Sequence, residues 1–145
     1  MDREDAKTRR RQDFVEPSLA VDAVARQVVD AALAVHRELG AGFGEGVYEN
    51  ALAFELELRG VDFERQRSVR VAYRGRVVGE GRMDLLVERR LVVELKAVDA
   101  LAAVHTAQLL AYLKATGLTL GLLLNFNVPR LALGLRRVVL SPPTK

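Results

Sequence analysis

The first patterned stretch of the chain runs from Leu19 to Leu39 and carries a single apolar stripe. Its apolar residues recur at steps of three and four: Val21, Val24, Val28, Ala31, Ala32, Val35 and Leu39. This spacing is the period of a helix with one buried face. Ser18 is a residue type that caps helix starts, and Gly40 is one that ends them. We therefore predict a helix over residues 19–39.

The rest of the chain divides into further helices and strands. Helical spacing recurs over residues 45–60 and 100–117, and each of these segments ends at a glycine. Alternating or continuous apolar runs between turn residues, which are typical of strands, cover residues 67–75, 76–88, 91–98, 118–126 and 133–140. In residues 67–75 the alternation predicts a strand with one buried face. The predicted order is two helices, three strands, a helix and two strands.

Composition favours one domain. The chain has 145 residues, 50% of them hydrophobic and none of them cysteine, so a core can form without disulfides. We expect a domain over residues 18–140, a charged leader over 1–17 and a tail over 141–145. No apolar run is long enough to cross a bilayer, and the charged leader does not resemble a signal peptide. We therefore expect a cytoplasmic protein without a membrane partner.

Four glycines stand at every second position from Gly40 to Gly46. Glycine-rich loops bind phosphate when a strand leads into them and a helix follows. Here a predicted helix precedes the glycines, and no Gly-Lys-Ser or Gly-Lys-Thr follows them. The pattern therefore favours a tight turn between two helices, which would bring the start of the second helix close to a site formed elsewhere.

The strand over residues 91–98 carries two opposite charges among apolar residues. Because side chains alternate along a strand, Glu94 and Lys96 share one face. A structural salt bridge is one interpretation, but a buried ion pair is seldom more stable than an apolar pair. Stability alone is therefore a weak reason for these charges.

The turn before Leu91 sets the register of the preceding strand. A turn with an odd number of residues pairs every apolar position with another: Val87 with Leu91, Leu85 with Val93, and Met83 with Leu95. It also places Asp84 opposite Glu94. A two-residue turn would mix the two faces, which a buried sheet does not tolerate. We therefore expect Asp84, Glu94 and Lys96 on one surface.

Two carboxylates beside a lysine suit a hard divalent cation, Mg²⁺ or Mn²⁺, because such ions prefer oxygen ligands. Lys96 could then orient or deprotonate a water molecule, or stabilise charge on a phosphate. The net charge of +3 tolerates a polyanion without requiring one. A phosphate-facing stripe and a solvated strand face are equally good explanations of six nearby arginines: Arg65, Arg67, Arg70, Arg74, Arg76 and Arg82.

Polar residues also share stripes with apolar ones on two predicted helices. Glu45 and Glu49 do so on the second helix, and His105, Gln108 and Tyr112 on the third. For His105 we favour a satisfied structural hydrogen bond over a functional role. For Gln108 and Tyr112 the two interpretations are evenly balanced.

Five motifs now occur in a recognisable order between His36 and Phe126: "GFGEGVY", "MDLLVE", "VVELKAV", "HTAQLLAYLKATG" and "GLLLNF". Together they resemble the GxxExxY family, which is assigned to the PD-(D/E)XK nuclease superfamily. The resemblance implies an α/β fold with a restriction-endonuclease-like core, a mixed central β-sheet flanked by helices in the order ααβββαββ.

The resemblance also implies a catalytic metal site. Asp84 matches the acidic residue of the superfamily, and Glu94-Leu95-Lys96 matches its (D/E)xK motif. The implied metal ligands are Asp84, Glu94, the Leu95 carbonyl and Glu45, with Lys96 as a catalytic group. The proline that is common before the acidic residue in the RecB-like branch is missing here.

A helix residue would complete this site, and spacing leaves open whether it is His36, Glu45 or Glu49. Gln108 and Tyr112 resemble the QxxxY element of the RecB-like branch. The expected function is Mg²⁺-dependent phosphodiester hydrolysis of nucleic acid, with DNA as the first candidate. The alternative is a non-catalytic module that retains the fold and binds nucleic acid or protein. A homo-oligomer stays open.

Overall fold

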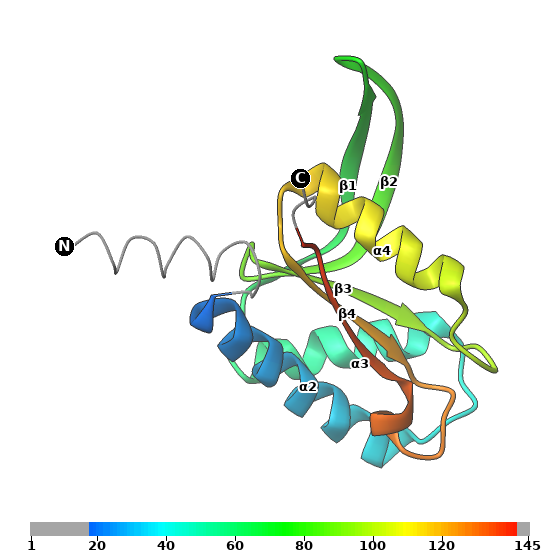
Figure 1. Cartoon of the computed structure of the whole chain (residues 1–145). Coiled ribbons are helices and arrows are strands. Elements are labelled where there is room, and N and C mark those ends of the chain that lie inside the picture. The colour runs from blue at the N-terminus through cyan, green and yellow to red at the C-terminus, as the bar shows by residue number, and fades with distance from the viewer. Residues whose placement is uncertain (1–17, 142–145) are drawn as a thin grey trace.

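The computed structural model describes residues 18–141. The predicted leader over residues 1–17 and the predicted tail beyond residue 141 lie outside the described residues. Figure 1 shows the elements, which are α2 (Leu19–Leu39), α3 (Glu45–Leu58), β1 (Phe63–Tyr73), β2 (Arg76–Val87), β3 (Leu91–Lys96), α4 (Ala103–Thr116), β4 (Leu120–Asn125), the 3-10 helix η1 (Leu131–Gly134) and β5 (Leu135–Val139). The predicted order is confirmed, and η1 is a short addition to it.

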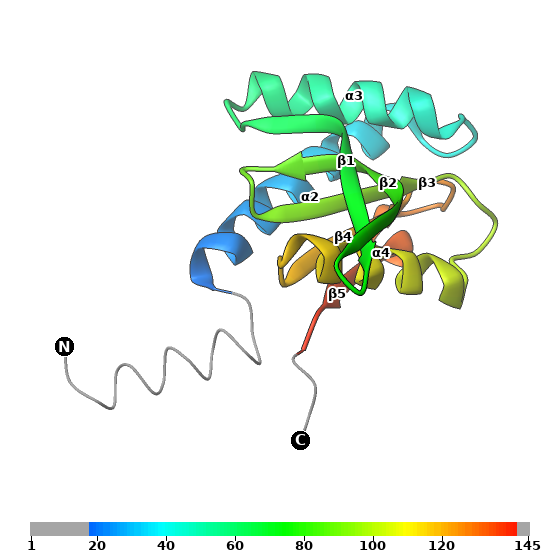
Figure 2. The same cartoon turned by 90° about the horizontal axis from the view of Figure 1, so that it is seen from above.

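The five strands form one mixed sheet in the order β1-β2-β3-β4-β5. Neighbouring strands are antiparallel except β3 and β4, which are parallel and joined by α4. Helices α2 and α3 cover one face of the sheet, and α4 covers the other (Figure 2). The fold is therefore α/β, with a helix layer on each side of the sheet. Within residues 18–141, no helix combines the length and apolar character needed to cross a membrane.

Two apolar cores lie on opposite faces of the sheet. The larger core joins α2 and α3 to residues such as Leu85, Val93 and Leu122. The smaller core joins α4 to the other face and contains Val69, Met83, Leu86, Val92, Leu109, Leu113, Leu123 and Val138. Strands β3 and β4 are buried along nearly their whole length because they contribute to both cores. This explains their continuous apolar sequences.

The glycine-rich segment is a turn between two helices, as the sequence predicts. Gly40 and Gly42 have φ angles of 68° and 113°, a region that favours glycine. The Tyr48 hydroxyl donates to Gly40 O over 2.6 Å and accepts from Phe43 N over 3.2 Å. The Tyr48 ring stacks on Phe126, with 4.6 Å between the ring centres. Tyr48 thus fastens the turn to the core.

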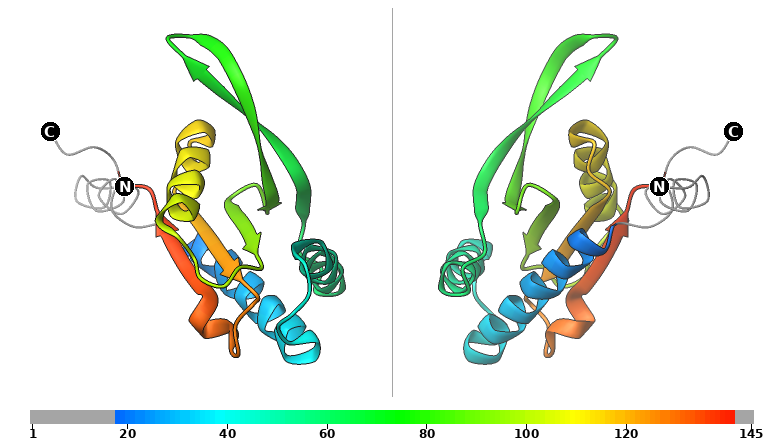
Figure 3. Two further views of the ribbon diagram at one scale, coloured as in Figure 1. Left: turned by 90° about the vertical axis from the view of Figure 1, so that its right-hand side faces the viewer. Right: turned by 90° about the vertical axis from the view of Figure 1, so that its left-hand side faces the viewer.

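Strands β1 and β2 form a long hairpin whose outer half extends beyond the rest of the sheet (Figures 1 and 3). The prediction that the alternating apolar residues of β1 are buried is correct only for Val69. Val71 and Tyr73 are 42% and 62% exposed. They lie in the projecting part of the hairpin, where no helix covers them.

The predicted register between β2 and β3 is confirmed where the two backbones pair. Val87 lies opposite Leu91 and Leu85 opposite Val93, across a turn of residues 88–90. The expectation that Met83 shares the face of Leu85 is wrong, because Met83 packs in the smaller core and Leu85 in the larger one. The chain changes face between them, at Asp84.

Candidate functional site

Asp84 and Glu94 lie side by side where the backbone pairing of β2 and β3 stops. The backbone amide of Asp84 donates to Glu94 Oε1 over 3.2 Å. The backbone amide of Leu95 donates to Asp84 Oδ2 over 2.8 Å. Each carboxylate therefore takes a backbone donor that a regular ladder would pair with a carbonyl. Asp84 and Glu94 are therefore in contact, as predicted, although the backbone register between β2 and β3 ends one residue before them.

Burial makes Glu94 a weaker acid than usual. The residue is only 4% exposed. Burial first, and then the charge of Asp84 and a side-chain hydrogen bond with it, raise the pKa of Glu94 from 4.5 to about 9. The backbone amide of Asp84 and the charge of Lys96 act in the opposite direction. Without a cation, Glu94 is therefore protonated at neutral pH.

Lys96 follows on the same strand and is partly exposed. Its backbone carbonyl accepts from Phe126 N over 2.9 Å, which fixes the end of β3 against the end of β4. No ion pair within residues 18–141 includes Lys96. The structural salt bridge considered from the sequence is therefore not formed, and the ammonium group is left without an acidic partner in the described part of the chain.

Among the three helix candidates, Glu49 is the one brought to Asp84. Gln66 Nε2 donates to Glu49 Oε1 over 2.6 Å and to Asp84 Oδ1 over 3.4 Å. Arg65 also donates to Glu49 Oε2, over 2.8 Å from Nη2 and 3.1 Å from Nε. A single amide thus connects the acid of α3 with the acid of β2.

The other two helix candidates lie elsewhere. Glu45 is exposed in the first turn of α3, and its side chain makes no hydrogen bond with the described residues. His36 is buried, and its Nε2 is 2.9 Å from the Val128 carbonyl, which it can only donate to. Its ring also lies beside Phe126, with 6.2 Å between the ring centres. His36 therefore packs α2 against the segment after β4.

The polar residues of α4 divide in the same way. His105 Nδ1 accepts from Ala102 N over 2.9 Å, so this histidine caps its own helix and the structural prediction is confirmed. Tyr112 lies against β2, because a Cβ on Gly81 would be 2.6 Å from Tyr112 Cε1. Gln108 is exposed and makes no side-chain hydrogen bond within residues 18–141. The structure thus brings Tyr112 next to the strand that carries Asp84, whereas Gln108 forms no contact of its own with the acids through a hydrogen bond.

Sequence reasoning missed Gln66, which stands in the middle of β1 with a φ of 50°. The pairs Arg65 with Leu85 and Arg67 with Met83 flank it, but Gln66 itself is not paired with β2. Its side chain lies between the two acids and bonds to both. Nothing in the alternation of the sequence predicts it.

Sequence reasoning also missed Asn125, which is 1% exposed at the end of β4. Its Oδ1 accepts from Val98 N over 3.1 Å and from Asn127 N over 3.2 Å, and its Nδ2 donates to Val98 O over 2.9 Å. Asn125 is the parallel neighbour of Lys96. Its side chain therefore fixes the segment that leaves β3. The only signal in the sequence is a polar residue at the end of an apolar strand.

Within residues 18–141, no three acidic or histidine side chains are close enough together to form a ready metal site. The arrangement is instead a contacting pair, Asp84 and Glu94, with Glu49 joined to it through Gln66. Carboxylate and carbonyl oxygens at such a site are the donors that a hard divalent cation prefers.

Comparison with known proteins assigns the chain to a family. No curated protein and no solved structure gives a significant match. One family model, described as the PD-(D/E)XK nuclease superfamily, matches residues 22–138. The matched region contains most of α2, all of β1 to β4 and nearly all of β5, and it includes Asp84 and Glu94-Leu95-Lys96. The chain therefore belongs to the PD-(D/E)XK nuclease superfamily.

Proposed function

We propose that this protein is a nuclease that hydrolyses phosphodiester bonds of nucleic acid and depends on Mg²⁺ or Mn²⁺. The observation that carries the proposal is the contact between Asp84 and the buried Glu94 at the break between β2 and β3. Two acids in contact repel one another when both are ionised, and a cation removes that cost. Membership of a nuclease superfamily supports the same conclusion.

The chemistry of the donors suits a hard divalent cation, and Glu49 would have to move closer to the pair of Asp84 and Glu94 to share the ion. Asp84, Glu94 and the Leu95 carbonyl would hold the ion, with Glu49 in place of Glu45 as the acid from α3. The ion would take the place of the proton that Glu94 otherwise keeps. When bound, it would act as a Lewis acid that activates water and shields the charge of the phosphate.

Lys96 is the remaining group of the proposed mechanism. Its ammonium group follows Glu94 on the same strand and pairs with no acid in the described part of the chain. It would therefore be free to donate to a phosphate oxygen or to orient the attacking water. The Leu95 amide, which donates to Asp84 Oδ2, would keep that carboxylate in place while the substrate binds.

The finer family assignment is also a proposal. We place the chain in the GxxExxY family because Gly42, Glu45 and Tyr48 follow that pattern in "GFGEGVY". The contacts of Tyr48 suggest a structural role for this motif. Its hydroxyl bonds to Gly40 of the glycine turn, and its ring stacks on Phe126 of the core. Glu45, by contrast, is left exposed at the start of α3.

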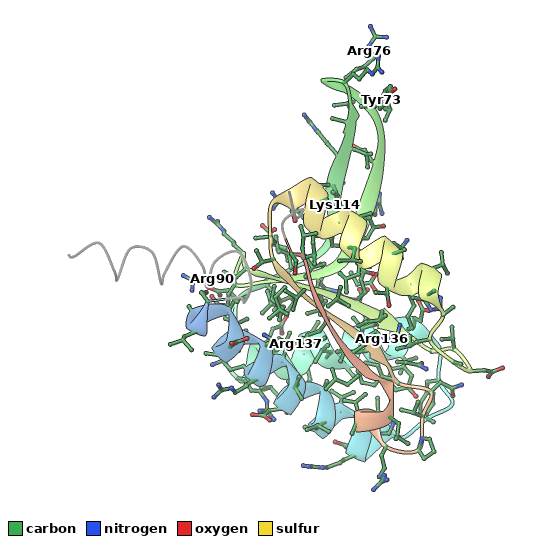
Figure 4. All side chains as sticks on the ribbon, in the orientation of Figure 1. Tyr73, Arg76, Arg90, Lys114, Arg136 and Arg137 are labelled. Atoms are coloured by element: carbon green, nitrogen blue, oxygen red, sulfur yellow. The ribbon has the colours of Figure 1, made fainter. Side chains whose placement is uncertain are left out.

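The β1–β2 hairpin is the proposed contact with nucleic acid, DNA in the first place. All six of its arginines are exposed. Arg65 pairs with Glu49 and Arg67 with Glu64, and the other four form no ion pair within residues 18–141. Figure 4 shows Tyr73 and Arg76 at the far end of the hairpin. A basic two-stranded arm of this kind suits a phosphate backbone.

Cleavage assays with a matched pair of variants test the proposed function. Single- and double-stranded DNA and RNA are incubated with Mg²⁺ or Mn²⁺ and with wild type, Asp84→Asn or Asp99→Asn. Asp99 is exposed in the segment after β3 and serves as the control. We expect cleavage by wild type and Asp99→Asn, and a loss of about 10²-fold or more for Asp84→Asn. Binding of nucleic acid without cleavage in either metal would instead support the non-catalytic module.

A further inference from the structure

Gln66 occupies a position between two acids that a cation would also favour. Its Nε2 lies 2.6 Å from Glu49 Oε1 and 3.4 Å from Asp84 Oδ1. Carboxylates accept hydrogen bonds and do not donate them, so the amide must present its nitrogen and not its oxygen. The distance between Glu49 Oε1 and Asp84 Oδ1 is therefore at most the sum of these two hydrogen-bond lengths.

A cation bound by both acids cannot coexist with this nitrogen. Mg²⁺ binds oxygen ligands at about 2.0–2.1 Å, so an ion shared by Glu49 and Asp84 would lie in the space that the amide fills. The amide is neutral, and it gives each acid a donor without adding charge. It thus satisfies both carboxylates in the same place where the ion would satisfy them.

The backbone of Gln66 is held in a strained conformation. Its φ of 50° lies in the left-handed region, which residues other than glycine seldom adopt. The residue also gives up pairing with β2, although Arg65 and Arg67 on either side are paired. The pairs on either side place Gln66 opposite Asp84. In the observed conformation its amide bonds to Asp84 and to Glu49 of α3.

Neither acid needs Gln66 to stay in place. Glu49 Oε2 accepts two hydrogen bonds from Arg65, and Asp84 Oδ2 accepts one from the Leu95 amide. Each carboxylate thus has one oxygen held by another group and the other oxygen bonded to Gln66. Removing the amide would free those two oxygens without releasing the acids.

We infer that Gln66 acts as a placeholder for a divalent cation between Glu49 and Asp84. Its amide fills the position when the metal is absent and leaves when the metal binds. The inference rests on the proposed function, because it assumes that the acids bind a metal. It makes Gln66 a competitor of the metal and not a ligand. Metal affinity therefore includes the cost of displacing the amide.

Calorimetric titration with Mg²⁺ and with Mn²⁺ tests the inference on the full chain. Gln66→Gly removes the amide and suits the left-handed backbone. We expect it to raise the association constant for the metal about tenfold, because two hydrogen bonds to carboxylates no longer have to be broken. Arg89→Gly is the control. Arg89 is exposed and has a φ of 56°, so this substitution relieves the same kind of backbone strain at a position away from the acids. It should bind metal as wild type does.

The outcomes separate this inference from the proposed function. Metal binding by wild type, with equal or weaker binding by Gln66→Gly, would overturn the placeholder and leave the metal site standing. Binding by neither protein would overturn both. Binding that is measurable only in Gln66→Gly would support the placeholder directly. If Gln66→Gly does not fold by circular dichroism, Gln66→Ala removes the same amide and should show the same rise in affinity.

Discussion

Gly81 of β2 lies against the hydroxyl end of the Tyr112 ring of α4. A Cβ on Gly81 would lie 2.6 Å from Tyr112 Cε1 and 3.0 Å from its hydroxyl oxygen. Real Cβ atoms do not approach other atoms so closely, so the bare backbone of Gly81 allows α4 to dock on the hairpin. The contact is three residues before Asp84, and it links the helix layer to the strand that carries the acid.

Replacing Gly81 by alanine should therefore destabilise the protein. Because the Tyr112 ring has to move, we expect Gly81→Ala to lower the free energy of unfolding by about 1–3 kcal/mol. Urea unfolding measures this. Gly79→Ala is the matched control, because Gly79 is in the same strand and a Cβ there meets no atom within 4 Å. Equal effects of the two substitutions would show that the ring contact is unimportant.

The stability of the metal-free protein should depend on pH through Glu94. The folded protein keeps a proton on Glu94 up to about pH 9, whereas the unfolded chain loses it near pH 4.5. Unfolding therefore releases a proton between these values, and the free energy of unfolding falls as pH rises through this window. Urea unfolding of wild type at several pH values in the presence of a chelator measures the slope.

Glu94→Gln should remove this contribution, since its amide does not titrate, and should make the metal-free protein more stable than wild type at about pH 8. Glu57→Gln, at an exposed position of α3, should keep the wild-type slope. Added Mg²⁺ should reduce the fall in wild type, because the cation favours the ionised carboxylate. If Glu94→Gln keeps the wild-type dependence of the free energy of unfolding on pH, another group must cause that dependence.

Lys96→Met should distinguish a catalytic role of Lys96 from a structural one. Since Lys96 forms no ion pair within residues 18–141, its loss leaves no acid without a salt-bridge partner, and we expect thermal stability close to wild type. As a catalytic group its loss should lower cleavage by about 10²–10⁴-fold. Thermal melts with and without Mg²⁺, beside a cleavage assay, measure both. A large loss of stability with metal bound, or undiminished cleavage, would reject the catalytic role.

The arginines of the hairpin should make binding to DNA sensitive to salt. Each phosphate contact contributes about one unit to the slope of log affinity against log salt. We expect Arg70→Ala and Arg74→Ala each to reduce the slope by about one, measured by fluorescence anisotropy. Arg26→Ala, at an exposed position on α2, should not change it. Affinity that does not vary with salt would make these arginines an ordinary solvated face.

Local patterns predicted the elements and one register well. The period of residues 19–39, with Ser18 and Gly40 at its ends, predicted α2 because capping and burial both act within a few residues. The register of β2 and β3 was predictable because only one turn length pairs apolar side chains with apolar side chains.

The remaining features depend on contacts between distant segments. Val71 and Tyr73 follow the alternation of a half-buried strand. They are exposed because the hairpin extends beyond the helices that would have to cover them. Met83 was assigned to the wrong face because the chain turns at Asp84, where side-chain oxygens replace the backbone pairing. Glu49 could not be chosen over Glu45 by helical spacing, since the choice depends on Gln66, a residue of another element.

The outer part of the projecting hairpin does not pack against the rest of the described chain. Residues 70–80 are all exposed, and none of them belongs to either core. Substitutions there should change stability little, whereas changes from Val69 inwards on β1, or from Gly81 inwards on β2, should disturb α4 or the acids. The length and charge of this arm can therefore change without disturbing the contact between Asp84 and Glu94. The proposed binding surface and the proposed metal site are structurally independent of each other.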